Sequence, residues 1–170
     1  MRLIKVLVTC SAILVLLAVS ANAAKVQVPE GTNISVKFPA SIKISSGEMS
    51  EGIPLLFELA TPVEIGGKVI VAKGATGTAV VKESVKAKKG GKPGKITIEF
   101  VELAPSEPWK AVDGSNIKLK GSVTAEGKGK KTLSYLFIFG LFIKGGQGEI
   151  PSGQIFTATV AESVILQDTE

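Results

Sequence analysis

Residues 69–81 read VIVAKGATGTAVV, and this stretch decides the fold. It joins a short apolar strand, a tight turn at Lys73-Gly74 and a second strand, because glycine can adopt the positive φ that such a turn requires. Looser copies are VPEGTNISV at residues 28–36 and IPSGQIFTA at residues 150–158. Each copy has an aliphatic residue, Pro or Ala, one variable residue, Gly and then a strand. We therefore predict that three glycines start strands of one all-β domain: Gly31, Gly74 and Gly153.

Alternation of apolar and polar residues extends this prediction along the chain. The phase of the pattern shifts at Val101 and Leu103, which indicates a β-bulge. We predict a small antiparallel or mixed barrel or sandwich of about seven to nine strands. The predicted strands lie around residues 33–38, 41–44, 55–59, 69–72, 75–81, 96–103, 117–123 and 156–166.

Residues 1–23 have the pattern of a secretory signal peptide. Arg2 and Lys5 precede an apolar region at residues 6–19, and Ala21-Asn22-Ala23 fits a cleavage site. The apolar region is shorter than the roughly 20 residues that span a bilayer as a helix. We expect export to the periplasm or to an outer-membrane-associated site, with a single β-barrel-like domain over residues 24–170.

The chain has no histidine, its one cysteine is Cys10, and its only arginine is Arg2. This composition excludes a disulfide and a Cys- or His-based metal site from the exported part. It also removes the commonest general base and the side chain best suited to nucleic acids. We expect no cofactor, no metal, no nucleic-acid partner and no enzymatic activity. The remaining catalytic pattern is Ser115-x-x-Lys118, which falls on a predicted turn and strand and lacks the companion motifs of Ser-Lys enzymes.

Residues 86–95 read KAKKGGKPGK, which predicts a flexible basic loop between two strands. Two interpretations are open. The loop is a solvated hairpin tip, as most charged runs are, or it contacts an anion such as a phosphate-bearing lipid head group. The candidate anion contacts are Lys86, Lys88, Lys89, Lys92 and Lys95.

Residues 133–143 read LSYLFIFGLFI, with no charge and four of the nine aromatic residues of the chain. The run is too short to span a bilayer as a helix. It fits a pair of buried strands bent at Gly140, and it equally fits a segment that dips into a membrane or meets a partner. Lysines flank it within residues 128–131 and at position 144, as expected of a membrane-facing or partner-facing loop. The candidate contacts are Tyr135, Leu136, Phe137, Ile138, Phe139, Leu141 and Phe142.

The order of these motifs resembles the TrbI-like β-barrel domain of type IV secretion outer-membrane complexes. The matching pieces are Val28–Thr32, Ser45-Ser46-Gly47, residues 71–77, Asp113-Gly114, the apolar run at 133–143 and the closing strand at 150–160. The resemblance implies a β-barrel and an apolar segment that reaches a membrane. We expect a non-enzymatic envelope protein that binds other envelope components or itself. The alternative is a membrane-docking module or secretion-complex-like component that uses residues 133–143.

Overall fold

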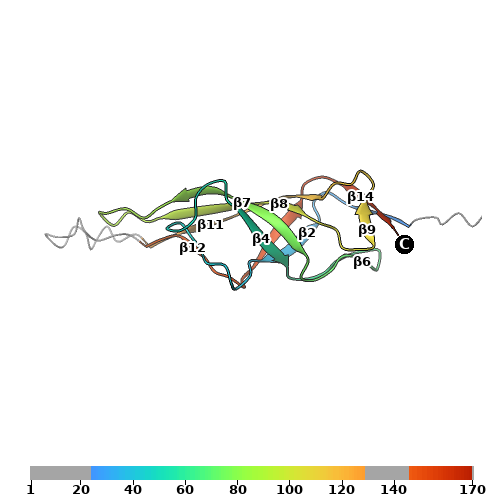
Figure 1. The fold of residues 1–170 in the computed structure, drawn as a ribbon, viewed down its shortest axis with the longest axis horizontal. Helices are drawn as coiled ribbons and strands as arrows, with labels where there is room; N and C mark the ends of the chain where they lie inside the picture. The colour runs from blue at the N-terminus through green and yellow to red at the C-terminus, as the bar shows by residue number, and fades with distance from the viewer. Residues whose placement is uncertain (1–23, 129–145, 170) are drawn as a thin grey trace, which may run out of the picture.

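A computed structural model describes residues 24–128 and 146–169, and every regular element in that part of the chain is a β-strand. The body is elongated, with the turn between β7 and β8 at one end and β1 and the C-terminus at the other (Figure 1). The strands are β1 (Lys25–Val28), β2 (Asn33–Lys37), β3 (Ile44–Ser45), β4 (Pro54–Leu59), β5 (Val63–Ile65), β6 (Lys68–Val71), β7 (Thr76–Val85), β8 (Lys95–Leu103), β9 (Trp109–Ala111), β10 (Ile117–Lys120), β11 (Ser122–Glu126), β12 (Glu149–Ile150), β13 (Ile155–Val160) and β14 (Val164–Asp168).

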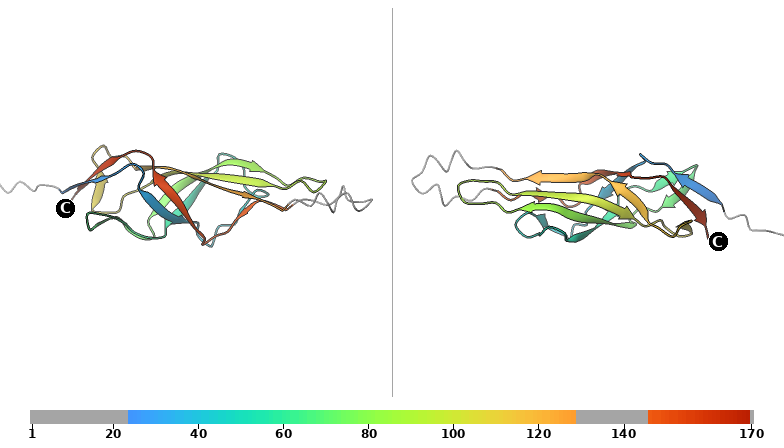
Figure 2. Two further views of the ribbon diagram at one scale, coloured as in Figure 1. Left: turned by 180° about the vertical axis from the view of Figure 1, so that it is seen from behind. Right: turned by 90° about the horizontal axis from the view of Figure 1, so that it is seen from above.

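Six of these strands close into an antiparallel barrel. Their hydrogen-bonded order is β10-β13-β2-β4-β7-β8, and β8 pairs back with β10 through Ile117↔Leu103. The other half of β8 pairs with β11, so that β7, β8 and β11 run together beyond the barrel (Figure 2). A three-stranded sheet, β1-β14-β9, and two short pairs, β3-β12 and β5-β6, complete the described fold. The predicted all-β barrel is confirmed.

The three predicted glycine turns share one backbone geometry and one type of hydrogen bond. Gly31, Gly74 and Gly153 have φ of 84°, 85° and 76°. Each N–H donates to a carbonyl at the end of a neighbouring barrel segment, at Val160, Leu59 and Phe38 respectively, over 2.9–3.0 Å. The strand that follows each turn is a barrel strand: β2, β7 or β13. The repeated phrase therefore fixes where three of the six barrel strands begin.

The stretch at residues 69–81 differs from expectation in one respect. It does contain two strands and a turn at Lys73-Gly74, but β6 pairs with β5, whereas β7 pairs with β4 and β8. The two strands are therefore not partners in a hairpin. The turn instead carries the chain from the β5-β6 pair into the barrel.

Aromatic side chains fill the barrel, as the alternation predicts. Phe38, Phe57 and Phe100 are buried, and the Phe100 ring packs edge-on against Phe57 with centroids 5.4 Å apart. Phe38 stacks on Phe100 with ring centroids 6.1 Å apart. The bulge predicted at Val101 is present, because Thr78 pairs with Glu102 while Ala79 pairs with Phe100. Val101 is thereby left unpaired with β7 and 40% exposed.

Several predicted strand limits differ from those in the structure, and the described residues form 14 strands, six of which make the barrel, where about seven to nine were predicted. Residues 117–123 do not form one strand, because Gly121 at φ 128° separates β10 from β11. Residues 125 and 126, which lie beyond the predicted limit at residue 123, belong to β11. Only Ile44 of the predicted strand at 41–44 is in a strand. The many short pairs outside the barrel account for the rest of the difference.

Candidate functional site

The hairpin of β7 and β8 extends beyond the barrel and carries the lysine-rich segment at its turn. The two strands are paired from Gly77↔Leu103 to Val85↔Lys95, and an isolated bridge joins Lys88 to Lys92 further out. Gly90 and Gly91 have φ of 78° and 69°, which closes a tight turn between them. The predicted loop between two strands is therefore present as a hairpin turn, and both interpretations of residues 86–95, a solvated tip and an anion contact, stay predictions.

The ion pairs of this hairpin lie closer to the barrel than the lysines of the turn. Near the barrel, Lys82 pairs with Glu99 at 2.9 Å, and further out Lys95 pairs with Glu83 at 2.7 Å. The hydrogen bond from Lys95 to Glu83 and the charge of Glu83 raise the pKa of Lys95, so it stays protonated and paired. Residues 84–98 contain five lysines and no acidic residue. Lys86, Lys88 and Lys92, which lie closer to the turn, belong to neither of these ion pairs.

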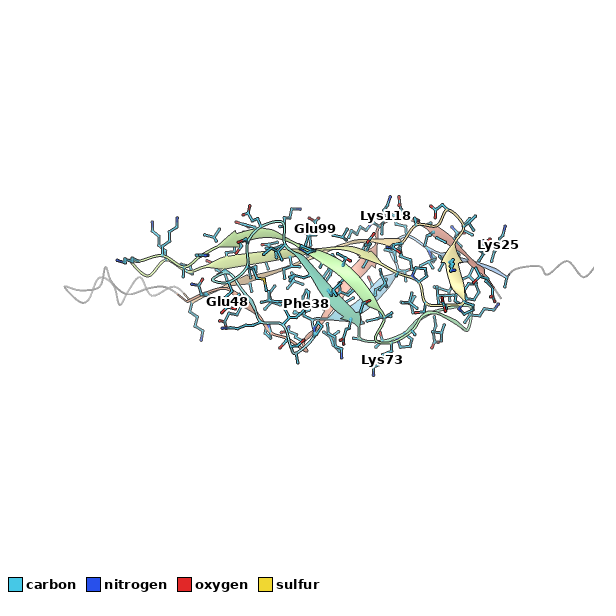
Figure 3. All side chains as sticks on the ribbon, viewed as in Figure 1. Lys25, Phe38, Glu48, Lys73, Glu99 and Lys118 are labelled. Atoms are coloured by element: carbon cyan, nitrogen blue, oxygen red, sulfur yellow. The ribbon has the colours of Figure 1, made fainter. Side chains whose placement is uncertain are left out.

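Among the five candidate anion contacts, Lys95 thus differs from the other four because it is held in an ion pair with Glu83. Lys86, Lys88, Lys89 and Lys92 are exposed. Within residues 24–128 and 146–169, Lys86, Lys88 and Lys92 have no ion-pair partner. Figure 3 shows nitrogen-tipped side chains projecting around this end of the molecule.

A part-buried polar junction holds the outer part of the hairpin, between the Val85↔Lys95 pair and the turn. The Gln147 side-chain oxygen accepts hydrogen bonds from the Ser46 hydroxyl at 2.8 Å and from the Ala87 N–H at 3.0 Å. The Ser46 hydroxyl in turn accepts from the Gly148 N–H at 3.0 Å. A side chain at Gly94 would overlap Ser46 and Gln147, so only glycine fits between them. We call these five residues the Ser46–Gln147 junction. Sequence analysis identified Ser46 only as part of a strand break and did not predict this contact.

The chain on either side of residues 129–145 is fixed to the same place. The Gly146 N–H donates to the Lys128 carbonyl at 3.0 Å, so the described residues nearest the two ends of that segment are joined. Gly94, between Lys95 and the hairpin turn, accepts from the Gly127 N–H at 2.8 Å and donates to the Gly146 carbonyl at 2.9 Å. The two residues that flank 129–145, Lys128 and Gly146, therefore lie together, beside the outer part of the hairpin. This is the candidate functional end of the molecule.

The candidate contacts Tyr135, Leu136, Phe137, Ile138, Phe139, Leu141 and Phe142 lie outside the described residues, as does the predicted signal peptide. In the described part of the chain there is no helix of the length and hydrophobicity needed to span a bilayer. That part also holds no group of three acidic or other metal-ligating side chains placed to bind a metal ion.

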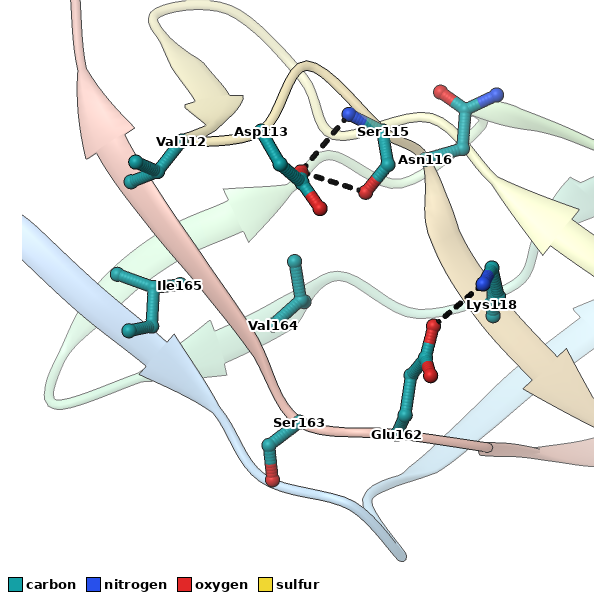
Figure 4. A pocket seen from close by; sticks show the side chains of 9 residues that line it. All are labelled: Val112, Asp113, Ser115, Asn116, Lys118, Glu162, Ser163, Val164 and Ile165. Carbon is teal, nitrogen blue, oxygen red and sulfur yellow. Dashed lines mark hydrogen bonds and ion pairs between the residues drawn. The ribbon is translucent and has the colours of Figure 1, made fainter.

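A cavity of about 570 Å3 lies away from the hairpin, where the loop before β10 meets the turn before β14 (Figure 4). Both residues of the Ser115-x-x-Lys118 pattern line this cavity. The Ser115 hydroxyl donates to the Asp113 carboxylate at 2.7 Å, and the Lys118 ammonium pairs with Glu162 at 2.8 Å. The hydrogen bond to Glu162 and its charge raise the pKa of Lys118, which opposes a role as a neutral base. Each residue thus has a partner other than the one that Ser-Lys chemistry requires.

Comparison with family models, with curated proteins and with solved structures gives no match for this chain.

Proposed function

We propose that the protein is a non-enzymatic module of the bacterial envelope that docks by the hairpin end of its β-barrel. The pattern of residues 1–23 supports export to the periplasm or to an outer-membrane-associated site. The composition supports a binding role, since it lacks histidine throughout and cysteine after Cys10.

One observation carries the proposal. The residues that bracket the uncharged run at 133–143, Lys128 and Gly146, are hydrogen-bonded to each other, and Gly94, in the outer part of the hairpin, is bonded to Gly146 and to Gly127. The most apolar stretch after residue 23 is therefore attached at the end that also carries the unpaired lysines. Apolar side chains next to basic ones are the combination that favours an interface with an anionic membrane.

Membrane docking is accordingly the better-supported of the two predicted roles. The barrel already has a full set of buried side chains from its own alternating strands, including Ile34, Val36, Phe57, Ile98 and Phe100. Leaving several large side chains of the apolar run in water would cost on the order of 5 kcal/mol, at about 25 cal/mol per Å2. Insertion into a membrane, or burial against a partner protein of the kind that the TrbI-like resemblance implies, removes that cost.

The test is to replace Phe137 and Phe139 together with Ser in the full chain. We expect the variant to keep the urea midpoint of the unchanged protein and to move from the detergent phase to the aqueous phase in a detergent-partition assay. A matched change, Phe156→Ser, removes a half-buried aromatic residue that packs on Phe38 and should lower stability instead. Loss of folding in the double variant would show that the run is core. Retention of both stability and partitioning would refute docking by this segment.

A further inference from the structure

We propose that the tip of the β7–β8 hairpin is a binding site for the phosphate groups of anionic lipids, built from Lys86, Lys88 and Lys92. The inference rests on the proposed docking by this end and names the chemistry that the hairpin recognises. It is carried by the backbone geometry of the tip and by the distribution of charge along the hairpin.

The first observation is a like-charge pair across the hairpin. Lys88 and Lys92 are directly opposite each other in an antiparallel bridge, with the Lys88 N–H donating to the Lys92 carbonyl at 3.1 Å. Side chains that oppose each other in such a pair leave the same face, with Cβ atoms about 5 Å apart. Two like charges in this position repel each other and weaken the pair. A phosphate between the two ammonium groups would turn that repulsion into two charge-assisted hydrogen bonds.

The second observation is that Lys86 joins the same surface. Ala87 lies between Lys86 and Lys88 and is buried, at 5% exposure, while both lysines are exposed. Because successive side chains of an extended segment point to opposite sides, Lys86 and Lys88 both point to solvent. Lys128, also exposed, adds a fourth positive charge at this end, since its neighbour Gly127 is hydrogen-bonded to Gly94.

The third observation is that the ion pairs within the hairpin lie on the barrel side of the tip. Glu83 pairs with Lys95 and Glu99 pairs with Lys82, and no acidic residue lies between positions 84 and 98. A membrane surface is favoured over a nucleic acid because the tip has no arginine and no aromatic residue to stack on bases.

The test uses binding of the purified protein to vesicles, with the triple variant K86Q/K88Q/K92Q. Each lysine near an anionic surface contributes about five-fold to membrane partitioning, so we expect a loss of roughly 100-fold on vesicles containing phosphatidylglycerol. On vesicles of phosphatidylcholine alone, the variant and the unchanged protein should bind equally. The matched control is K25Q/K73Q/K110Q, which removes the same charge from exposed positions away from the hairpin and should bind anionic vesicles within a few-fold of the unchanged protein.

Three results would overturn the proposal. One is equal binding of the triple variant and the unchanged protein to anionic vesicles. Another is an equal loss in the control variant, which would show that net charge alone acts. The third is competition by millimolar inorganic phosphate that abolishes binding, which would indicate a free anion as the ligand. In each case the F137S/F139S experiment reports separately on docking by the apolar run.

The K88Q variant alone should raise the urea midpoint or leave it unchanged, because the substitution removes the repulsion between Lys88 and Lys92. A clear decrease in the midpoint would contradict the argument from the like-charge pair.

Discussion

The Ser46–Gln147 junction gives the sharpest prediction about how the functional end is held together. We expect Gln147→Ala to lower the free energy of unfolding by about 2 kcal/mol. The substitution removes the one acceptor shared by the Ser46 hydroxyl and the Ala87 N–H, at 2.8 Å and 3.0 Å. A buried donor left without a partner costs about 1–3 kcal/mol. Gln147 is only half-buried, so water can accept hydrogen bonds from the two donors in place of the lost side-chain oxygen. The expected loss of stability is therefore smaller than the full cost of two unpaired buried donors.

The assay is urea unfolding combined with amide hydrogen exchange. Gln154→Ala is the matched control, since Gln154 is exposed in the turn before β13 and should change stability by no more than about 0.5 kcal/mol. In the Gln147→Ala variant, the Ala87 amide should lose protection, while amides in the barrel should change only through global stability. The reasoning is refuted if the two variants have the same urea midpoint, or if the Ala87 amide exchanges as slowly as before.

Three further predictions concern the barrel and its far end. Gly74→Ala should cost about 1 kcal/mol or more, because residue 74 has φ of 85°; an unchanged urea midpoint would mean that the turn tolerates a side chain. Gly77→Ala should cost about 1–3 kcal/mol, because an added Cβ would overlap both the Phe57 ring and the Glu102 carbonyl, and the companion change Phe57→Leu should recover only the part of the loss that is due to the ring. The pKa of Asp113 lies below its ordinary value of 3.8, chiefly because the Ser115 N–H donates to the carboxylate. The stability due to Asp113 is therefore present above pH 3.8 and is lost as the pH falls through the lower folded pKa. The difference in urea midpoint between the unchanged protein and Asp113→Ala should narrow as the pH is lowered below 3.8; a gap that widens would contradict this sign.

The features that could be predicted from the sequence are those that depend on local pattern. Alternation identified the buried faces of β2, β4 and β8, and the phase shift located the bulge at Val101. Glycines in the repeated phrase marked the three strand starts because a positive φ is a local requirement. The Gly121 break was missed, because an isolated glycine in an alternating run is also compatible with a continuous strand.

The candidate site could be predicted only in part, because its contacts join distant segments. Ser46 and Gln147 are 101 residues apart, and neither has a local signal that identifies the other. The ion pair of Lys95 with Glu83 depends on the register of the β7–β8 hairpin, which contains two shifts. Without that register, the sequence alone assigned Lys95 to the same group as the tip lysines.

The most direct test of docking by the hairpin end is a comparison of two labelled positions in a chain that begins at Ala24, which contains no natural cysteine. Val85 lies on the hairpin and is 39% exposed, and Val112 lies beside the distant cavity and is 52% exposed. Each is replaced by cysteine and carries an environment-sensitive fluorophore, and the protein is mixed with anionic vesicles that contain a lipid-borne quencher. Docking by the hairpin end predicts quenching of the label at position 85 and an unchanged signal at position 112. Quenching at position 112 with none at position 85 would contradict the proposed orientation, and no quenching at either position would contradict membrane docking itself.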